Sequence, residues 1–251
     1  SVLVTGPTGS GKTTTLYSTL KQLATDEVNV CTIEDPIEMV EPSFNQMQIQ
    51  HNIDVSFASG VRALMRQDPD IIMIGEIRDL ETAEMAIQAA LTGHLVISTL
   101  HTNDAPTAVS RMLDLGVPAY MIRATVLGVM AQRLVRTLCP HCKEEEPVDT
   151  EAWTLLTKPF RVKPPVRFYI PKGCRDCRDT GFPGRMGIYE ILPMSAEIQS
   201  QIRADTELAA LRKAAFSQGM RTLRLSGAQK VGAGLTTVSE VLRVAPISQD
   251  I

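Results

Sequence analysis

The sequence has few aromatic residues, no long apolar run and no excess of basic residues. Phe, Trp and Tyr make up 4% of its 251 residues, and 25 Lys and Arg stand against 28 Asp and Glu, a net charge of −3. Nucleic-acid-binding chains supply aromatic stacking surfaces and basic tracks, so no nucleic-acid partner is expected. The longest apolar stretch, Tyr120–Leu138, contains Arg123 and Arg133 and is predicted to be a packing helix that does not span a membrane.

Cysteine is also scarce, with five residues in the chain. In a sequence of cytosolic character, these cysteines indicate reduced thiols or a metal site instead of a disulfide framework. The hydrophobic fraction of 44% is ordinary for a globular protein, and 251 residues suffice for a large core with a smaller appended domain. Because the sequence begins directly at a buried strand, we expect it to be a fragment that lacks an N-terminal region.

A glycine-rich loop stands between a short apolar strand at residues 2–4 and a predicted helix. Strand, glycine-rich turn and helix in this order predict a triphosphate-binding loop, because backbone amides and the helix N-terminus face the phosphates. Lys12 would reach the β- and γ-phosphates, and the Thr13 hydroxyl would bind Mg²⁺. The residues predicted to bind ATP or GTP here are Gly6, Pro7, Thr8, Gly9, Ser10, Gly11, Lys12, Thr13 and Thr14.

Acidic residues follow two further predicted strands. Glu34 and Glu38 lie in an acidic turn, and Glu76 follows the apolar strand at 71–74. The carboxyl ends of parallel strands form ligand sites in open α/β sheets, so Glu76 is predicted to orient or deprotonate the attacking water. A local salt bridge for Glu76 and a solvated loop for the acidic turn are the alternatives. Gly75 stands where many phosphate-loop proteins carry an Asp associated with Mg²⁺.

Two histidines and two arginines complete the candidates of this region. His101 leaves the buried strand at 95–100 on the same sheet edge as the phosphate loop, whereas His94 precedes that strand. His101 is therefore interpreted either as a γ-phosphate sensor or as a structural histidine. Arg62 and Arg66 are four residues apart and lie on one face of a predicted helix.

Apolar strands alternate with helices through residues 1–137, which predicts an α/β fold: a RecA-like P-loop NTPase core with a mainly parallel sheet covered on both faces. A smaller subdomain is expected over residues 138–185 and a small C-terminal helical region over 186–251. The helices expected in that region lie near 195–203, 205–219, 221–231 and 237–244.

Two Cys-x-x-Cys pairs, Cys139 with Cys142 and Cys174 with Cys177, are separated by 31 residues. Each pair can offer two thiolates to one ion, and four thiolates close a tetrahedral Zn²⁺ site without an open position, so the zinc is expected to be structural. A lobe with so little core would depend on the metal for its stability. Two redox-active dithiols are the alternative. Cys31 is interpreted as a buried apolar thiol.

Several motifs are informative as a set: the phosphate loop, Thr32–Glu38, Arg66–Asp70, Gly75–Asp79, His94–Asp104, the four paired cysteines and Gly187–Glu190. Together they resemble the secretion-superfamily ATPases. With the cysteines included, the chain looks like the C-terminal ATPase domain of a type II secretion ATPase or of the closely similar pilus-assembly ATPases. The resemblance covers nearly the whole chain.

The resemblance implies ATP hydrolysis with Mg²⁺ and assigns roles to individual residues. Gly75 is normal in this family, which strengthens Glu76 as the catalytic carboxylate. Glu34 and Glu38 match an acidic box near Mg²⁺ and water, His94 and His101 match a histidine box, and Arg62 and Arg66 match arginines of nucleotide sensing or subunit contacts.

The resemblance also implies partners and a location. The family forms homo-hexamers in which a preceding N-terminal domain closes over the nucleotide, so the isolated chain is expected to hydrolyse ATP slowly. The ring is expected in the cytoplasm, attached to the bacterial inner membrane through platform and bitopic secretion proteins, where it would drive pseudopilus extension.

Three other functions fit a phosphate loop. A nucleic-acid translocase with a zinc grip is disfavoured by the acidic charge and the few aromatics. A scaffold that nucleotide only locks would bind ATP without turnover. A P-loop kinase is disfavoured because no lid with clustered arginines is evident.

Overall fold

The computed structural model describes residues 1–245; the last six residues of the expected C-terminal region, 246–251, lie outside it. The chain folds into two compact units. The first consists of Ser1–Ala131 and Ile191–Gly219, and the second of Gln132–Glu190 and the segment from Met220 onward. The division into three parts at residues 1–137, 138–185 and 186–251, which the sequence suggested, remains a prediction.

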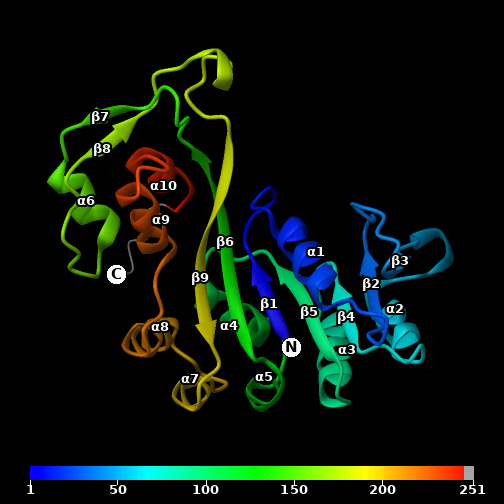
Figure 1. Ribbon diagram of the computed structural model, residues 1–251. Coiled ribbons are helices and arrows are strands. Elements are labelled where there is room, and N and C mark those ends of the chain that lie inside the picture. Colours follow the sequence, from blue (N-terminus) through cyan, green and yellow to red (C-terminus); the bar gives the residue numbers. More distant parts are fainter. Residues whose placement is uncertain (246–251) are drawn as a thin grey trace. The chain divides into compact units, whose positions relative to one another are not determined.

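A seven-stranded sheet carries the strands expected from the apolar runs (Figure 1). Its strands follow the order β3-β2-β4-β5-β1-β6-β9, and the five pairs from β3 to β6 are parallel. The central strands are buried on both faces, which explains their continuous apolar sequences. The strands are β1 (Val2–Thr5), β2 (Val30–Glu34), β3 (Asn45–Gln48), β4 (Ile71–Ile74), β5 (Leu95–Leu100), β6 (Gly128–Thr137) and β9 (Gly184–Pro193).

Helices cover both faces of this sheet in the first unit. Right-handed crossovers place α1 on one face and α2, α3 and α4 on the other, in agreement with Figure 1. The side chains of Asp79 and Asp104 cap α3 and α4. Each accepts a hydrogen bond from the backbone N–H group three residues later in the sequence. The helical elements are α1 (Lys12–Leu23), η1 (His51–Ile53), α2 (Phe57–Leu64), α3 (Leu80–Leu91), α4 (Ala105–Asp114), α5 (Ala119–Thr125), α7 (Ala196–Gln201) and α8 (Leu208–Ser217).

The prediction of a single helix over Tyr120–Leu138 is wrong. Only α5 is helical, and β6 then pairs with β1 in parallel, from Gly128 beside Val2 to Ala131 beside Thr5. The Leu, Arg and Gln residues of this stretch suit a helix, but pairing with a buried strand outweighs their weak intrinsic preference. Among residues 1–245, no helix has the length and apolar character needed to cross a membrane.

The second unit has a small core that sequence reasoning underestimated. Trp153, Leu156 and Phe168 are buried within it, and the rings of Trp153 and Phe168 lie 6.0 Å apart. The C-terminal helices near 221–231 and 237–244 are present as predicted. The elements of the unit, besides parts of β6 and β9, are β7 (Glu144–Glu146), α6 (Thr150–Thr157), β8 (Phe168–Ile170), η2 (Arg175–Cys177), α9 (Leu223–Gly232) and α10 (Val238–Val244).

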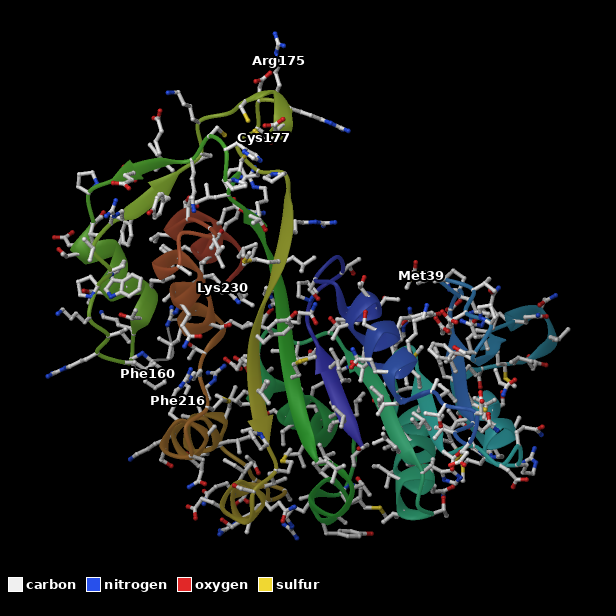
Figure 2. The ribbon with its side chains drawn as sticks, viewed as in Figure 1. Met39, Phe160, Arg175, Cys177, Phe216 and Lys230 are labelled. Atoms are coloured by element: carbon white, nitrogen blue, oxygen red, sulfur yellow. The ribbon has the colours of Figure 1, made fainter. Side chains whose placement is uncertain are left out.

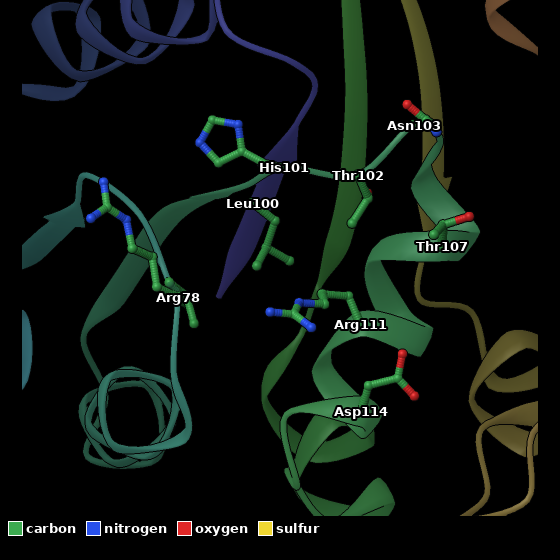
Figure 3. Close-up of a pocket in the computed structure, with 9 residues that line it drawn as sticks. Arg78, Leu100, His101, Thr102, Asn103, Thr107, Arg111 and Asp114 are labelled. Atoms are coloured by element: carbon green, nitrogen blue, oxygen red, sulfur yellow. The ribbon is translucent and has the colours of Figure 1, made fainter.

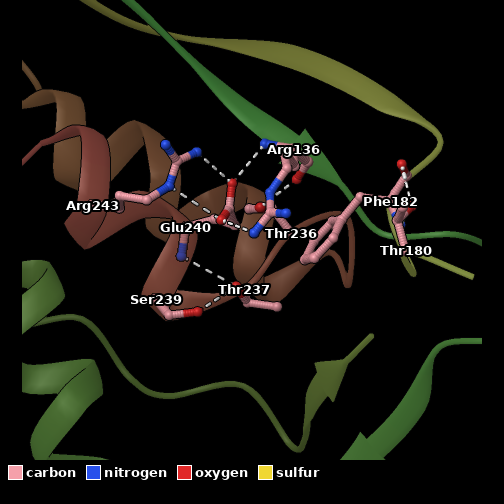
Figure 4. A network of polar contacts seen from close by, with 8 residues as sticks. All are labelled: Arg136, Thr180, Phe182, Thr236, Thr237, Ser239, Glu240 and Arg243. Atoms are coloured by element: carbon pink, nitrogen blue, oxygen red, sulfur yellow. Dashed lines mark hydrogen bonds and ion pairs between the residues drawn. The ribbon is translucent and has the colours of Figure 1, made fainter. Parts of the chain in front are cut away.

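A buried carboxylate joins α10 to the end of β6 in this unit (Figure 4). Glu240 is 3% exposed and accepts hydrogen bonds from Arg136 at 2.7 Å and Arg243 at 2.8 Å. Burial opposes its ionisation, but the two guanidinium groups prevail and lower the pKa of Glu240 to about 2. The Arg136 guanidinium also lies 4.1 Å above the Phe182 ring, next to the second cysteine pair.

Candidate nucleotide and metal sites

The glycine-rich loop connects β1 to α1, as the sequence predicted. Gly9 and Gly11 have φ angles of 77° and 86°, which residues other than glycine rarely adopt. The Lys12 amino group lies beneath the loop and donates to the carbonyl oxygens of Gly6 at 2.8 Å and Pro7 at 3.2 Å. The lysine amino group is therefore held against the backbone at the start of the loop.

The first turn of α1 adds the positive end of a helix to this loop. Thr13 and Thr14 occupy its second and third positions, where backbone N–H groups have no partner within the helix. Such amides and the helix dipole favour an anion, and a Thr13 hydroxyl at this position is the group that binds Mg²⁺ in phosphate loops. The loop and helix thus have the donor set that a triphosphate with Mg²⁺ requires.

The sheet register brings the other candidate segments to the same edge. Thr5 pairs with Leu100, and Ile33 pairs with Ile74, so β1, β2, β4 and β5 end together. A hydrogen bond of 2.8 Å between the hydroxyls of Thr5 and Thr102 ties the start of the phosphate loop to the residue after His101. His101 therefore follows its strand beside the loop, as expected.

Glu76 is held by two basic side chains at this edge. One carboxylate oxygen is bonded to Arg78, and the other lies 3.4 Å from Nε2 of His101. The carboxylate raises the pKa of the Arg78 guanidinium. The Glu76 side chain is 15% exposed, whereas Arg78 and His101 are about half exposed at 62% and 47%. The structure thus brings Glu76 and His101 together, and it adds Arg78, which sequence reasoning did not single out.

A pocket of about 460 Å³ opens next to this cluster (Figure 3). Arg78 and His101 line one side of it, and Arg111 and Asp114 of α4 line the other. Its size is within the range of small-molecule sites, and its lining combines charged side chains with the apolar Ile77 and Leu100. Two of its lining residues, Arg78 and His101, are the residues that contact the Glu76 carboxylate.

The close approach of two strands explains why glycine occupies position 75. A Cβ atom on Gly75 would lie 3.2 Å from the Ile33 carbonyl oxygen and 3.4 Å from Cα of Glu34. The Gly75 N–H donates to that same carbonyl at 2.8 Å. A side chain at this position would press against the backbone of β2, which accounts for the glycine.

Glu34 lies at the end of β2 with its carboxylate almost fully enclosed. It is 3% exposed and accepts hydrogen bonds from Tyr17 at 2.8 Å and from Thr32 at 2.7 Å. Glu38 lies farther along the same turn and is exposed. Tyr17 was not identified from the sequence, although a tyrosine on the apolar face of α1, between Leu16 and Leu20, signals a buried hydroxyl that needs a partner.

Three predicted residues are not brought to the phosphate loop. His94 precedes β5 and His101 follows it, so the length of the strand, about 20 Å, separates them. Nδ1 of His94 instead lies 2.9 Å from the Ala89 carbonyl oxygen. Arg66 donates to the Arg62 carbonyl oxygen at 2.8 Å, and the Arg62 guanidinium lies 3.9 Å from the Glu81 carboxylate of α3.

The four paired cysteines form one cluster in the second unit. The sulfur atoms lie within 4.8 Å of one another, with Cys139–Cys174 at 3.9 Å and both Cys142–Cys177 and Cys174–Cys177 at 3.8 Å. A tetrahedral Zn²⁺ with Zn–S bonds of about 2.3 Å requires sulfurs about 3.8 Å apart. The cluster therefore fits zinc and is too widely spaced for disulfides, and these four residues would hold the ion with no open position.

Backbone amides donate hydrogen bonds to two of these sulfurs and favour the thiolate form of one of them, Cys177. Cys177 accepts from the N–H groups of Cys174 and Gly181, each at 3.2 Å, and Cys142 accepts from Gly173 at 3.3 Å. Burial acts against ionisation of Cys177, but these donors outweigh it and lower its pKa to about 7. Arg175, between the two ligands of this turn, points outward (Figure 2). Cys31 is buried in β2 and stands apart from the cluster.

Comparison with known protein families gives a match along nearly the whole chain. The family model described as "Type II/IV secretion system protein" matches residues 1–243. The chain is 60% identical over 247 residues to the type IV pilus assembly ATPase TfpB of Acinetobacter baylyi, covering 98% of this chain and 42% of that protein. It is 47% identical over 243 residues to the type II secretion system ATPase E of Vibrio cholerae, covering 97% of this chain and 48% of that protein.

A solved structure shows the same fold. The pilus retraction motor PilT with bound ADP superposes with a TM-score of 0.71 at 30% sequence identity, over 100% of this chain and 62% of that chain. The likeness confirms the mixed α/β ATPase fold predicted from the alternation of strands and helices. The chain spans about half the length of the curated relatives described above.

Proposed function

Because this chain belongs to the type II/IV secretion system protein family, we propose that it is the ATP-hydrolysing part of a motor that drives pseudopilus assembly in type II secretion. One observation carries the proposal: the phosphate loop, Glu76 and His101 meet at one edge of the sheet. Secretion and pilus-assembly relatives both support the hydrolytic step.

In the proposed reaction, the loop amides and Lys12 bind the β- and γ-phosphates of ATP. The Thr13 hydroxyl would hold Mg²⁺, which would supply charge neutralisation at the terminal phosphate. Glu76 accepts a proton from the attacking water, and His101 contacts the γ-phosphate. Glu34 and Glu38 shape the acidic side of the site. Arg62 and Arg66, away from the loop, are assigned to contacts between subunits.

The cysteine cluster has a structural role in this proposal. Its four thiolates would enclose Zn²⁺ completely, so the ion stabilises the turns of the second unit and takes no part in hydrolysis. Loss of γ-phosphate contacts shifts equilibria between domain arrangements in motors of this kind. In a homo-hexamer attached to inner-membrane platform and bitopic proteins from the cytoplasmic side, this shift would extend the pseudopilus.

A second candidate function has a specific observation in its favour. Identity to the pilus assembly ATPase TfpB, at 60%, exceeds the 47% identity to the Vibrio cholerae secretion ATPase. The same motor would then extend a type IV pilus. Restoration of pilus assembly or of protein secretion in strains that lack either ATPase distinguishes the two functions.

Substitution of Glu76 tests the hydrolytic proposal. Glu76→Gln should lower the single-turnover rate of ATP hydrolysis at least about 100-fold while nucleotide affinity, measured by equilibrium binding, changes little. Glu84→Gln, an exposed change on α3, serves as the matched control. Unchanged turnover in Glu76→Gln would show that Glu76 is not the base, and absence of nucleotide binding by the parent chain would refute the proposal as a whole.

A further inference from the structure

Tyr17 connects the phosphate-loop helix to the acidic turn. It is the sixth residue of α1, whose first residues are Lys12 and Thr13. Its hydroxyl lies 2.9 and 2.8 Å from the two carboxylate oxygens of Glu34, where the turn begins, and 2.9 Å from the Met39 carbonyl oxygen, where the turn ends. One phenol therefore touches both ends of the segment that contains Glu38.

The hydrogen bonds around this hydroxyl have a defined direction. Gln46 of β3 has two amide protons, and its Nε2 lies 2.9 Å from both the Tyr17 oxygen and the Met39 carbonyl oxygen. The Tyr17 hydroxyl has one proton, and its shortest contact is with Glu34. Gln46 thus donates to Tyr17 and Tyr17 donates to Glu34, while the Thr32 hydroxyl donates to the other Glu34 oxygen at 2.7 Å. Each donor strengthens the next.

This chain of hydrogen bonds is buried and packed against an aromatic ring. Tyr17 and Glu34 are each 3% exposed, and the Tyr17 ring packs against Phe44 with centroids 5.7 Å apart. Burial, and then the adjacent Glu34 carboxylate, raise the pKa of Tyr17, so the phenol keeps its proton and acts as a donor. A hydrogen bond to a buried carboxylate is among the stronger kinds of hydrogen bond.

We propose that Tyr17 is a positioning residue for ATP hydrolysis, which holds the Glu34 carboxylate and the acidic turn in register with the phosphate loop, and that Gln46 orients the Tyr17 hydroxyl. The inference rests on the proposed function. When the loop binds triphosphate, any displacement of α1 reaches the acidic turn directly through this contact.

Tyr17→Phe isolates the hydroxyl, because the ring still packs against Phe44. The variant should lower kcat about tenfold, with a change of less than about twofold in KM for ATP and with cooperative unfolding retained. Gln46→Met should lower kcat in the same direction and by less. Tyr120→Phe, at a tyrosine that is 59% exposed, is the matched control and should leave kcat unchanged.

A double-mutant cycle separates positioning from general loosening of the fold. If Tyr17 acts through Glu34, adding Tyr17→Phe to Glu34→Gln should change kcat no further. An unchanged kcat in Tyr17→Phe, or a tenfold loss that persists in the Glu34→Gln background, would overturn the inference and leave the proposed function standing. A parent chain that binds ATP without turnover would instead overturn the proposed function, and this inference with it.

Discussion

Arg212 of α8 donates a hydrogen bond of 2.7 Å to Asp104, the residue that caps α4. Both side chains are largely enclosed, at 13% and 22% exposure. Asp104 follows His101 by three residues and also accepts from the Thr107 N–H at 2.8 Å. A helix late in the sequence of the first unit therefore fixes the loop that carries His101.

Arg212→Ala should destabilise the protein by about 1–2 kcal/mol, since it leaves the Asp104 carboxylate partly buried without its cation. Chemical denaturation measures this change. Lys213→Ala, at the exposed neighbouring position on α8, is the control and should have no measurable effect. Equal stability of the two variants would show that the ion pair contributes nothing.

The buried Glu240 predicts a dependence of stability on pH. Its pKa is lowered to about 2 from the ordinary 4.5, so its contribution is complete above about pH 4.5 and is lost as the pH falls toward 2. Glu240→Gln should lower the free energy of unfolding by about 2 kcal/mol at pH 7. This value is smaller than the pKa shift alone implies, because solvent screens the half-exposed arginines. Stability measured between pH 3 and 7 should also vary less in the variant. Glu145→Gln, which breaks an exposed pair with Arg167, is the control.

Removal of one cysteine ligand should release the metal. Cys142→Ser is expected to reduce bound zinc from about one ion per chain to well below half, and to make the second unit sensitive to proteolysis. Elemental analysis of the purified proteins gives the zinc content. Cys31→Ala, which removes a buried thiol outside the cluster, should keep its zinc. Equal metal content in both variants would contradict four-thiolate ligation.

Gly60 is needed for the close contact of α2 with the sheet. A Cβ atom there would lie 1.8 Å from Cδ1 of Ile33 and 3.3 Å from Sδ of Met47. Ile33 is fully buried, so shifting its Cδ1 would disturb the packing around it, and Gly60→Ala should cost about 1–3 kcal/mol although alanine favours helices. Gly184→Ala, with no atom within 4 Å of the added carbon, should be tolerated in the same denaturation experiment.

The sequence allowed the phosphate loop, the buried strands and the cysteine cluster to be predicted, because each has a recognisable pattern: a glycine-rich loop, apolar runs and two Cys-x-x-Cys pairs. The β6 strand was missed because its residues suit a helix and only pairing with β1 makes it a strand. The partners of Glu34 were missed for a related reason: Tyr17 and Gln46 lie 17 and 12 residues away and meet it only when α1, β2 and β3 are assembled. His94 lies far from the phosphate loop because it precedes β5, whereas the loop lies at the end of the sheet where β5 finishes. A sequence motif does not show which end of a strand a residue occupies.

The spacing of the four sulfurs affects how metal dependence should be interpreted in this protein. An ion held there would join two turns separated by 31 residues, so stripping it would dismantle a cross-link. Inactivation by EDTA would then have two independent sources, of which only the loss of Mg²⁺ would be reversed immediately by adding magnesium. Activity that returns only after zinc is supplied and the protein is refolded would show that zinc is needed for the fold of the second unit. It would not show that zinc takes part in phosphate cleavage.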